Sequence, residues 1–374
     1  MRIGITGESG FIGSSLKNYL SLNQDVNIIK FNSSYFDNFI ELRKFVKECD
    51  VIIHLAAKNR HDRLDELFNI NIDLVKKLIE ALEIENAKPH VYFASSTQEK
   101  LDNPYGCSKK IGQSLLENWA RLSGANLTSL IIPNVFGPFC KPDYNSFIAT
   151  FAFKLCNGEV PQISNDKYVD LIFVDSLSKY IIQHIYKNID TKAIIETLEI
   201  PVDFTQSVSN IFKLFNRYKE IYIDKGIIPD LRDRNEVNLF NTFRSYINYK
   251  LLFPIRLKKS TDERGIFVET IKLMTGGQVS FSTTEPTITR GNHFHTRKIE
   301  RFVVIKGQAL IQLKKYGQDN ILEFNLDGNN PSYVDIPVWH SHNIKNIGES
   351  ELLTLFWINE FYDESDSDTF INKI

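Results

Sequence analysis

The sequence has few cysteines, almost no net charge and no long apolar run, and each absence argues against a class of protein. The four cysteines, at positions 49, 107, 140 and 156, show no paired spacing, which argues against a disulfide framework and for reduced thiols in the cytoplasm. The formal net charge is −2, with lysine and arginine scattered, so neither nucleic acid nor a membrane is expected as a partner. No apolar stretch reaches the ~18 residues of a transmembrane helix, and no signal peptide is expected before the strand-like "RIGIT".

The length and the apolar content predict two folded domains. A chain of 374 residues is too long for one core of ordinary domain size. Its hydrophobic fraction of 43% is enough for packed cores, and it shows no internal repeat and no low-complexity tract.

The first two hundred residues alternate short apolar runs with helical patterns. This rhythm predicts an α/β domain, a parallel sheet with helices on both faces. The expected strands cover residues 2–6, 26–31, 50–57, 90–96 and 127–137, and the expected helices cover residues 11–22, 64–84 and 106–123.

From about residue 255 the pattern changes. Strand-like runs such as "RFVVIKG", "SYVDIP" and "LLTLFWIN" follow one another closely, separated by Gly, Asn and Asp turns. This texture predicts an all-β sandwich or barrel. We therefore expect one domain over residues 1–245 and a second over residues 246–374.

The stretch "TGESGFIG" predicts a phosphate-binding turn. It places Gly7, Gly10 and Gly13 three residues apart after the first expected strand, with Phe11 and Ile12 opening the helix. A residue without Cβ lets backbone N–H groups approach a pyrophosphate at the helix N-terminus. We expect a nucleotide cofactor here, although a tight strand–helix turn without a ligand has the same pattern.

A second motif, "YGCSK", places Tyr105 and Lys109 four residues apart on one helix face. A phenol with a pKa near ~10 is a poor acid–base group at neutral pH, and a nearby ammonium is expected to lower that pKa. Ser96 ends the preceding strand, where its hydroxyl can polarise a substrate carbonyl, and Thr97 is the alternative. The spacing by itself also fits a solvated helix face.

In combination, "TGESGFIG", "HLAA", "PYGCSK" and "PNVFGP" resemble the extended short-chain dehydrogenase/reductase family over residues 1 to about 240. The resemblance implies a Rossmann-type, doubly wound domain. It also implies a set of site residues: Ser96, Tyr105 and Lys109 for catalysis, Leu55, Ala56 and Ala57 for the cofactor, and Asn134 for the substrate.

The cofactor is expected to be NADPH. The second expected strand ends "KFNSS", with Asn32 in place of the acidic residue that would hold a free ribose 2′-hydroxyl. Lys58 and Arg60, just after "HLAA", are the candidates for gripping a 2′-phosphate.

The stretch "RGNHFHTRKIERFVVIKG" predicts a metal site in the second domain. His293 and His295 alternate along an expected strand, Glu300 opens the next, and "PVWHSHNIKN" supplies His342. Three imidazoles and one carboxylate suit a borderline divalent ion, most of all zinc. His340 is a spare imidazole, and Trp339 is expected in the core or in a pocket wall.

The spacing of these ligands resembles the first motif of the cupin double-stranded barrel. Pro337, His342 and Asn346 resemble the second cupin motif, with Trp339 where that motif has glycine. The resemblance implies a cupin fold for the second domain.

The stretches "DERGIFVE" and "TRGNH" resemble the nucleotide-sugar 3,5-epimerase branch of cupins. That resemblance implies Arg264, Glu269 and Arg290 as substrate contacts, with the arginines on the diphosphate, and His293 as a base. An imidazole that binds a metal through one nitrogen cannot use that lone pair as a base, so we favour His293 as a ligand.

Over its whole length the sequence resembles bacterial bifunctional capsular-polysaccharide enzymes. Such enzymes epimerise C3 of a UDP-2-acetamido-2,6-dideoxy-4-ketohexose in the cupin and reduce the 4-ketone in the reductase domain. The product is UDP-N-acetyl-6-deoxytalosamine, on the route to UDP-N-acetyl-L-fucosamine, and a homodimer is expected. Lys141, Asn145 and Ser146 are candidates for a sugar-nucleotide loop, unless this is an ordinary surface loop. Two alternatives stay open: a 4-epimerase with bound NAD and a non-catalytic cupin, or a reductase with a 3,4-ketoisomerase cupin.

Overall fold

The computed structural model describes residues 1–189, 191, 194–263 and 265–374. The chain forms two compact units. Unit 1 comprises Met1–Phe147 and Asp166–Val208, and unit 2 comprises Ile148–Asn165 and Ser209–Ile374. The expected boundary between residues 245 and 246, inferred from the change in sequence pattern, stays a prediction.

Unit 1 is built on a six-stranded parallel sheet with the strand order β2-β1-β3-β4-β5-β8. Its strands are β1 (Arg2–Thr6), β2 (Asn27–Ile29), β3 (Val51–His54), β4 (His90–Ser96), β5 (Leu127–Ile132) and β8 (Ile195–Glu199). The expected strand 127–137 ends early because Pro133 has no N–H for the ladder. The chain continues from there into a second sheet of β6 (Asn134–Phe136), β7 (Tyr168–Phe173) and β9 (Phe204–Ser207).

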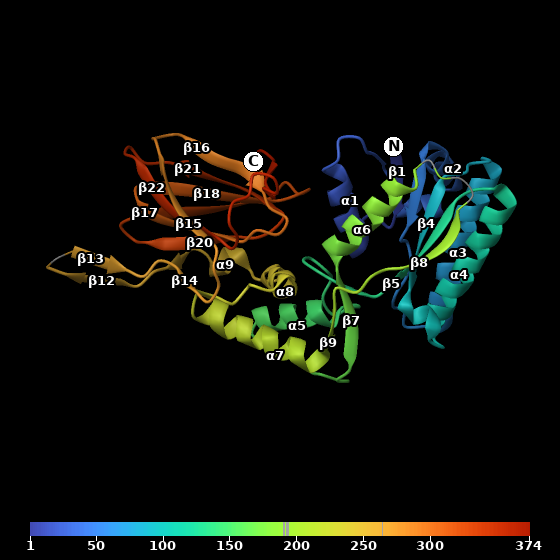
Figure 1. Cartoon of the computed structure of the whole chain (residues 1–374), viewed down its shortest axis with the longest axis horizontal. Helices are drawn as coiled ribbons and strands as arrows, with labels where there is room; N and C mark the ends of the chain where they lie inside the picture. Colours follow the sequence, from blue (N-terminus) through green and yellow to red (C-terminus); the bar gives the residue numbers. More distant parts are fainter. Residues whose placement is uncertain (190, 192–193, 264) are drawn as a thin grey trace. The chain divides into compact units, whose positions relative to one another are not determined.

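Helices cover both faces of the six-stranded sheet. In Figure 1, α1 (Phe11–Ser21) and α6 (Val174–Lys187) lie on one face, and α2 (Phe39–Glu48), α3 (Leu64–Ile84) and α4 (Pro104–Ser123) lie on the other. Two 3₁₀ turns, η1 (Ser33–Phe36) and η2 (Thr97–Lys100), complete the layer. The Rossmann-type, doubly wound fold predicted from the sequence is confirmed.

The core of unit 1 follows from helical periodicity. Leu67, Val75, Leu78 and Leu82 are buried and fall on one face of α3. Val75, Leu78 and Leu82 pack in a core that also contains Leu116 of α4. In the sheet, β1 has β2 on one side and β3 on the other. Ligands bind at the carboxyl ends of strands where the order reverses in this way, so the loops after β1 and β3 are the expected cofactor site.

Unit 2 contains two five-stranded antiparallel sheets. The first has the order β11-β20-β17-β22-β15, with β11 (Ile255–Arg256), β15 (Gln278–Thr284), β17 (Glu300–Lys306), β20 (Ser332–Ile336) and β22 (Leu352–Ile358). The second has the order β19-β18-β21-β16-β23, with β16 (Thr289–Phe294), β18 (Gln308–Lys315), β19 (Ile321–Asp327), β21 (His340–Asn346) and β23 (Phe370–Ile371). The predicted cupin-type, all-β fold is confirmed.

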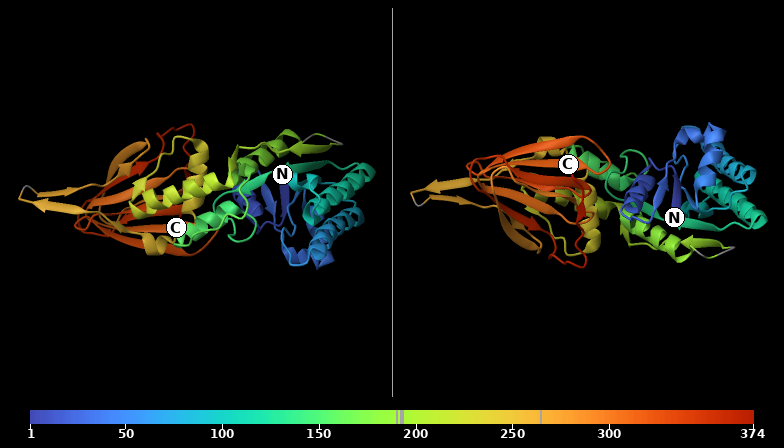
Figure 2. Two further views of the ribbon diagram at one scale, coloured as in Figure 1. Left: turned by 90° about the horizontal axis from the view of Figure 1, so that it is seen from below. Right: turned by 90° about the horizontal axis from the view of Figure 1, so that it is seen from above.

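Further elements surround these two sheets. A hairpin of β12 (Lys259–Asp262) and β13 (Gly265–Val268) projects from them in all views (Figures 1 and 2). The short strands β10 (Ile227–Ile228) and β14 (Lys272–Leu273) pair in parallel. The helices are α5 (Phe147–Cys156), α7 (Val208–Tyr218), the π-helix η3 (Lys219–Asp224), α8 (Arg234–Arg244) and α9 (Tyr249–Leu252). Across the part of the chain that the structure describes, no helix is both long and apolar enough to cross a bilayer.

Candidate active site and metal centre

The turn after β1 is shaped for a phosphate group. Gly7 has a φ of +79°, and a Cβ there would lie 3.0 Å from the backbone nitrogen of Ala56, so the loops after β1 and β3 touch through their backbones. A Cβ at Gly13 would lie 2.2 Å from the carbonyl oxygen of Gly7, so α1 is pressed against the same turn. The pattern "TGESGFIG" is therefore required by close backbone packing.

The N-terminus of α1 offers free donors to an anion. Gly10 is the N-cap, and no side chain among the described residues caps this helix. The first N–H groups of an uncapped helix, here those of Phe11, Ile12 and Gly13, need an outside acceptor and carry the positive end of the helix dipole. This arrangement fits a cofactor pyrophosphate.

The residues expected at the cofactor ribose lie on the loops that follow β2 and β3. Asn32 is exposed, and its Oδ1 accepts a hydrogen bond from the Ser34 amide at 3.0 Å, which caps η1. Leu55, Ala56 and Ala57 continue from β3, and the Lys58 and Arg60 side chains beyond them are exposed. Their roles toward NADPH stay predictions.

Helix α4, which carries the predicted catalytic residues Tyr105 and Lys109, is locked against the end of β4. Ser96 ends β4, and its Oγ accepts a hydrogen bond from the Gln98 amide at 3.2 Å. A Cβ at Gly106 would lie 2.0 Å from the Gln98 carbonyl oxygen, so only glycine allows this approach. The turn of α4 that carries Tyr105 is therefore held beside the turn that carries Ser96.

Lys109 lies below Tyr105 in the interior of unit 1. It is 4% exposed, and its Nζ donates to the Ala94 carbonyl at 2.8 Å and lies 5.7 Å from the centre of the Tyr105 ring. Burial lowers the pKa of Lys109 to about 8. Burial, followed by the nearby Tyr144, raises the pKa of Tyr105 to about 12.

The expected lowering of the Tyr105 pKa is thus not seen in this structure. The reason is that the ammonium of Lys109 is engaged with the Ala94 carbonyl, while burial disfavours the phenolate. Tyr105 consequently keeps its proton at neutral pH, which is the state that a general acid needs.

The candidate sugar-nucleotide loop carries Tyr144, which contributes to the raised pKa of Tyr105. The Lys141 ammonium lies 5.5 Å from the centre of the Tyr144 ring. Asn145 is exposed, whereas Ser146 bonds the Cys140 thiol, which is a structural contact. Tyr144 was not singled out from the sequence. Asn134, at the start of β6, is exposed.

Asn71 of α3 is a second residue that sequence reasoning missed. Its side chain is buried and bonds both backbone groups of Lys58, at 2.7 and 3.0 Å, and the Ser108 hydroxyl at 3.1 Å. Ser108 in turn donates to the Tyr105 carbonyl at 2.7 Å. Asn71 therefore links the cofactor loop to the catalytic helix.

In unit 2, the four predicted metal ligands come together between the two sheets. His293, His295, Glu300 and His342 each offer one ligand atom, and these atoms lie within 4.8 Å of one another. The Oε2 of Glu300 is 3.1 Å from His295 Nε2 and 3.0 Å from His342 Nε2. His295 follows the end of β16, which carries an irregularity between Gly291 and His293.

The donor set fits a divalent cation. The Nδ1 atoms of His295 and His342 face the carbonyl oxygens of Asp368 and His340, so both Nδ1 atoms carry the proton and both Nε2 atoms present lone pairs. These Nε2 atoms and Glu300 Oε2 are buried without a hydrogen-bond partner among the described residues. Buried acceptors that converge without a donor need a cation.

The fourth ligand, His293, is also in the state that a metal requires. Burial and the neighbouring His342 lower the pKa of His293 to about 4, so the ring is neutral. His340 is not a member of the group, because none of its ligand atoms joins the cluster formed by the described residues.

Trp339 occupies the turn where the cupin motif has glycine. Its φ is +58°, which is the left-handed conformation that glycine adopts readily. Its ring stacks on Phe294 at 5.4 Å between centroids, and its amide donates to the His295 carbonyl at 2.7 Å. These contacts hold the strained residue in place, and Trp339 is a core residue, as expected from the sequence.

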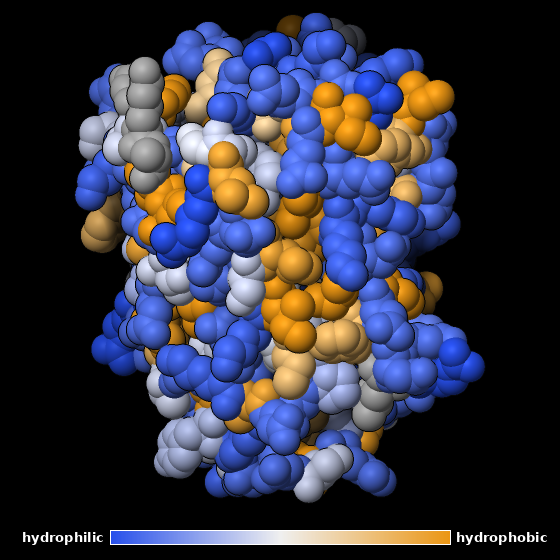
Figure 3. Space-filling view, turned by 90° about the vertical axis from the view of Figure 1, so that its right-hand side faces the viewer, coloured by the Kyte–Doolittle hydropathy of each residue, from blue (hydrophilic) through white to orange (hydrophobic). Residues whose placement is uncertain are grey.

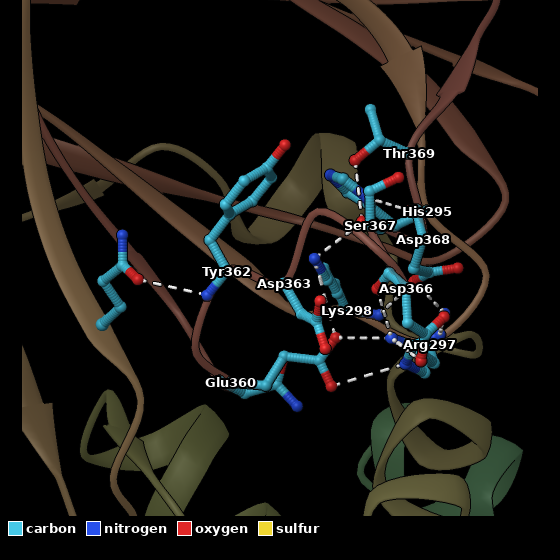
Figure 4. A network of polar contacts seen from close by, with 12 residues as sticks. His295, Arg297, Lys298, Glu360, Tyr362, Asp363, Asp366, Ser367, Asp368 and Thr369 are labelled. Atoms are coloured by element: carbon cyan, nitrogen blue, oxygen red, sulfur yellow. Dashed lines mark hydrogen bonds and ion pairs between the residues drawn. The ribbon is translucent and has the colours of Figure 1, made fainter.

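The segment after β22 fixes the orientation of His295 (Figure 4). The Asp368 carbonyl accepts a hydrogen bond from His295 Nδ1 at 2.6 Å. The Asp368 carboxylate accepts four more from the loop that follows His295: from the amide and hydroxyl of Thr296 at 3.1 and 2.7 Å, and from the amides of Arg297 and Lys298, both at 3.0 Å. Asp368 therefore holds the backbone of the ligand loop and one ligand tautomer together.

Replacing Asp368 with asparagine is expected to weaken metal binding by about 10- to 100-fold, the usual effect of losing an outer-shell partner. The new NH₂ group would face N–H donors and break the loop contacts. Competition with a chromogenic chelator measures the affinity. Asp366→Asn is the matched control, because Asp366 pairs with Arg297 at the surface. Equal affinities of the two variants would contradict the role of Asp368.

The three residues expected to bind substrate in the cupin lie in different places. Arg290 of β16 lies opposite Ile344 of the neighbouring strand β21, and His293 lies opposite His342. Ile344 and His342 are two residues apart and share a face, so Arg290 lies on the face that carries the predicted metal ligands. Glu269 forms an ion pair with Lys272 at 2.7 Å, away from that face. Arg264 lies outside the described residues.

Comparison with known proteins agrees with both folds. Residues 3–193 match the model of the NAD dependent epimerase/dehydratase family, and residues 260–370 match the polysaccharide biosynthesis C-terminal domain. A UDP-2-acetamido-2,6-beta-L-arabino-hexul-4-ose reductase of Pseudomonas aeruginosa is 28% identical over 375 residues, covering 99% of this chain and 98% of the relative.

Among solved structures, the capsular polysaccharide assembling protein CapF from Staphylococcus aureus is 33% identical and superposes with a TM-score of 0.62, covering 100% of both chains. The match extends through both units. The chain belongs to the NAD dependent epimerase/dehydratase family and, like CapF, continues into a cupin-type polysaccharide biosynthesis domain.

Proposed function

We propose that the protein is a bifunctional enzyme acting on a UDP-2-acetamido-2,6-dideoxy-4-ketohexose. The cupin inverts C3, and the Rossmann-type unit then reduces the C4 ketone with NADPH to give UDP-N-acetyl-6-deoxytalosamine. The observation that carries the proposal is that one chain places Tyr105 beside a buried Lys109 in one unit and four convergent metal ligands in the other. Its full-length relatives in capsule biosynthesis support this reading.

The chemistry explains why the two sites belong on one chain. A proton on C3 is acidic only while C4 is a ketone, because the carbanion is stabilised as an enolate. Epimerisation therefore precedes reduction, and reduction fixes the new centre. The two units would act on the same C4 carbonyl. This carbonyl serves first as the electron sink for C3 deprotonation and then as the hydride acceptor.

In the reductase site, the three predicted catalytic residues have different roles. NADPH supplies the hydride for C4. Ser96 polarises the ketone, and the protonated phenol of Tyr105 gives its proton to the oxygen that becomes the alcohol. Lys109 orients the ribose and supplies positive charge below Tyr105. NADPH is favoured over NADH because Asn32 stands where an acidic residue would hold a free ribose 2′-hydroxyl. Lys58 and Arg60, which follow the stretch "HLAA", could bind a 2′-phosphate.

In the cupin site, His293, His295, Glu300 and His342 would hold one divalent ion, with zinc suiting the three nitrogens and one oxygen. Such an ion supplies a Lewis acid for a carbonyl or a structural brace. An imidazole bound through its lone pair cannot also act as the base, so the proton acceptor is another group. Arg290 would hold the diphosphate, and we propose the same role for Arg264.

A homodimer in the cytoplasm completes the proposal. Among the described residues, all four cysteines are free thiols, which suits a reducing compartment. Figure 3 views the side on which α3 and α4 lie in Figure 1, and shows hydrophobic side chains on a mostly hydrophilic face. Ile111 and Leu122 of α4 are exposed and support association through this helix.

Incubation with the UDP-4-keto-6-deoxy sugar and NADPH, followed by NMR of the product, tests the proposal. The expected result is one NADPH oxidised per product, with inverted C3 and a new hydrogen on C4. A product formed without net NADPH oxidation would indicate a 4-epimerase with bound NAD. A ketone moved to C3 would indicate a ketoisomerase.

A further inference from the structure

A hollow of about 240 Å³ lies on the outer face of the cupin. It is bordered by η3, β11 and β14, and Arg301 and Tyr333 line it. Arg301 follows the metal ligand Glu300 on β17, and successive side chains on a strand point to opposite faces. The hollow is therefore separated from the metal site by the sheet itself.

The lining of the hollow is positively charged. Five basic side chains line it against two acidic ones: Lys225, Arg256, Lys258, Lys272 and Arg301 against Asp224 and Glu269. Both carboxylates and two of the cations are already engaged: Glu269 pairs with Lys272 at 2.7 Å, Asp224 with Lys219 at 3.1 Å, and Lys225 with Glu220 at 2.6 Å. Arg256 and Lys258 at the rim form no ion pair with another described residue. Positive charge on the rim therefore remains available to a ligand.

Positive charge is also in excess beneath the hollow. Arg301 is 1% exposed and pairs with the buried Asp335 at 2.7 Å. Arg244, also 1% exposed, donates to the Ile336 carbonyl at 3.0 Å and to the Tyr222 hydroxyl at 3.3 Å, and that hydroxyl donates to Asp335 at 2.6 Å. Two buried guanidinium groups thus face one carboxylate. Buried charge without a full counter-charge is unfavourable, and an anion in the hollow would offset it.

The Tyr333 hydroxyl is a donor without an acceptor. Tyr333 is 2% exposed, and its hydroxyl has no hydrogen-bond partner among the described residues. The hydroxyl lies against Gly226, where a Cβ would come within 2.8 Å of it. The Arg301 guanidinium lies 3.8 Å from the centre of the Tyr333 ring, which fixes the ring. A buried hydroxyl in a basic hollow therefore awaits an acceptor.

We propose that this hollow binds a phosphoryl group, as a phosphate ester or a diphosphate, at a site separate from the metal centre. A phosphoryl group has enough oxygens to accept from Tyr333 while its charge is neutralised by Arg256 and Lys258 at the rim. A nucleoside diphosphate and free pyrophosphate share this chemistry. The inference is about binding alone and does not rest on the proposed reaction.

Titration calorimetry of the full chain with inorganic pyrophosphate and with UDP tests the site. Tyr333→Phe removes only the hydroxyl, and losing a hydrogen bond to a charged group is expected to weaken one binding component by about 10- to 100-fold. Arg256→Glu is expected to weaken the same component. Tyr362→Phe, on an exposed ring of the same unit, is the matched control and should bind as the wild type.

The two probes distinguish the source of the phosphoryl group. Loss of pyrophosphate binding in Tyr333→Phe supports a site for free phosphates, and a loss confined to UDP supports a nucleotide site. Without either probe, Tyr333→Phe should melt no lower than the wild type, because it removes a hydroxyl that has no partner. Unchanged titrations with both probes, or a clearly lower melting temperature, would overturn the inference.

Discussion

Replacing Tyr105 with phenylalanine is expected to lower the rate of ketone reduction by about 10²-fold or more, the usual scale of general-acid catalysis. The substitution keeps the ring and removes the proton that burial holds on the phenol. Folding should be unaffected, because the Tyr105 hydroxyl forms no hydrogen bond with another described residue. The neighbouring hydrogen bonds use the Tyr105 carbonyl and the Lys109 ammonium instead. NADPH oxidation in the presence of the keto sugar measures the rate.

Tyr168→Phe is the matched control for this experiment. Tyr168 belongs to the same unit, on β7, and is 73% exposed, so the loss of its hydroxyl should leave the rate unchanged. If Tyr105→Phe oxidised NADPH at a near-normal rate, another group would be the acid and the assignment of "YGCSK" would be wrong.

Replacing His342 with alanine is expected to remove the metal from the cupin. His342 is fully buried, and its Nε2 lies 3.0 Å from Glu300 Oε2, so no water-exposed group can take its place. Elemental analysis should find about one divalent ion per chain in the wild type and almost none in the variant. A variant that kept full occupancy would show that the ligand set is wrong.

Loss of the ion should also lower thermal stability, because metal binding to the folded state adds to the free energy of unfolding. A thousandfold excess of ion over its dissociation constant stabilises by about 4 kcal/mol. Removing His342 also leaves a cavity, so chelation supplies the control. A chelator should lower the melting temperature of the wild type and leave that of His342→Ala unchanged.

The sequence predicted those parts of both sites that depend on short spacings. Gly7, Gly10 and Gly13 are needed for contacts within one turn and its neighbouring loop, and Tyr105 and Lys109 lie one helical turn apart. The convergence of the candidate metal ligands was also predictable, because His293 and His295 lie on one strand end and Glu300 opens the next. Such patterns depend on local geometry, which the residue order determines directly.

The missed features depend on contacts between distant residues. Asp368 bonds His295 across 73 positions of the chain, and no spacing rule connects an aspartate in a polar tail with a histidine on a strand. In the sequence, Asn71 is an ordinary polar residue of a helix. Its role depends on its hydrogen bonds with Lys58 in the loop after β3, which no local pattern shows. No local pattern shows that residues 148–165 fold with the cupin unit. The pKa of Tyr105 likewise depends on how deeply the helix is buried.

Proton exchange at C3 tests the central claim most directly. The claim is that the cupin performs carbon-acid chemistry on the keto sugar independently of the reductase site. The measurement is NMR of the UDP-4-keto-6-deoxy sugar after incubation with Tyr105→Phe in D₂O without NADPH. The account predicts that deuterium enters C3, since deprotonation needs only the ketone and a base. A substrate recovered with its full complement of C3 protium would contradict it, and the cluster of His293, His295, Glu300 and His342 would then serve structure alone.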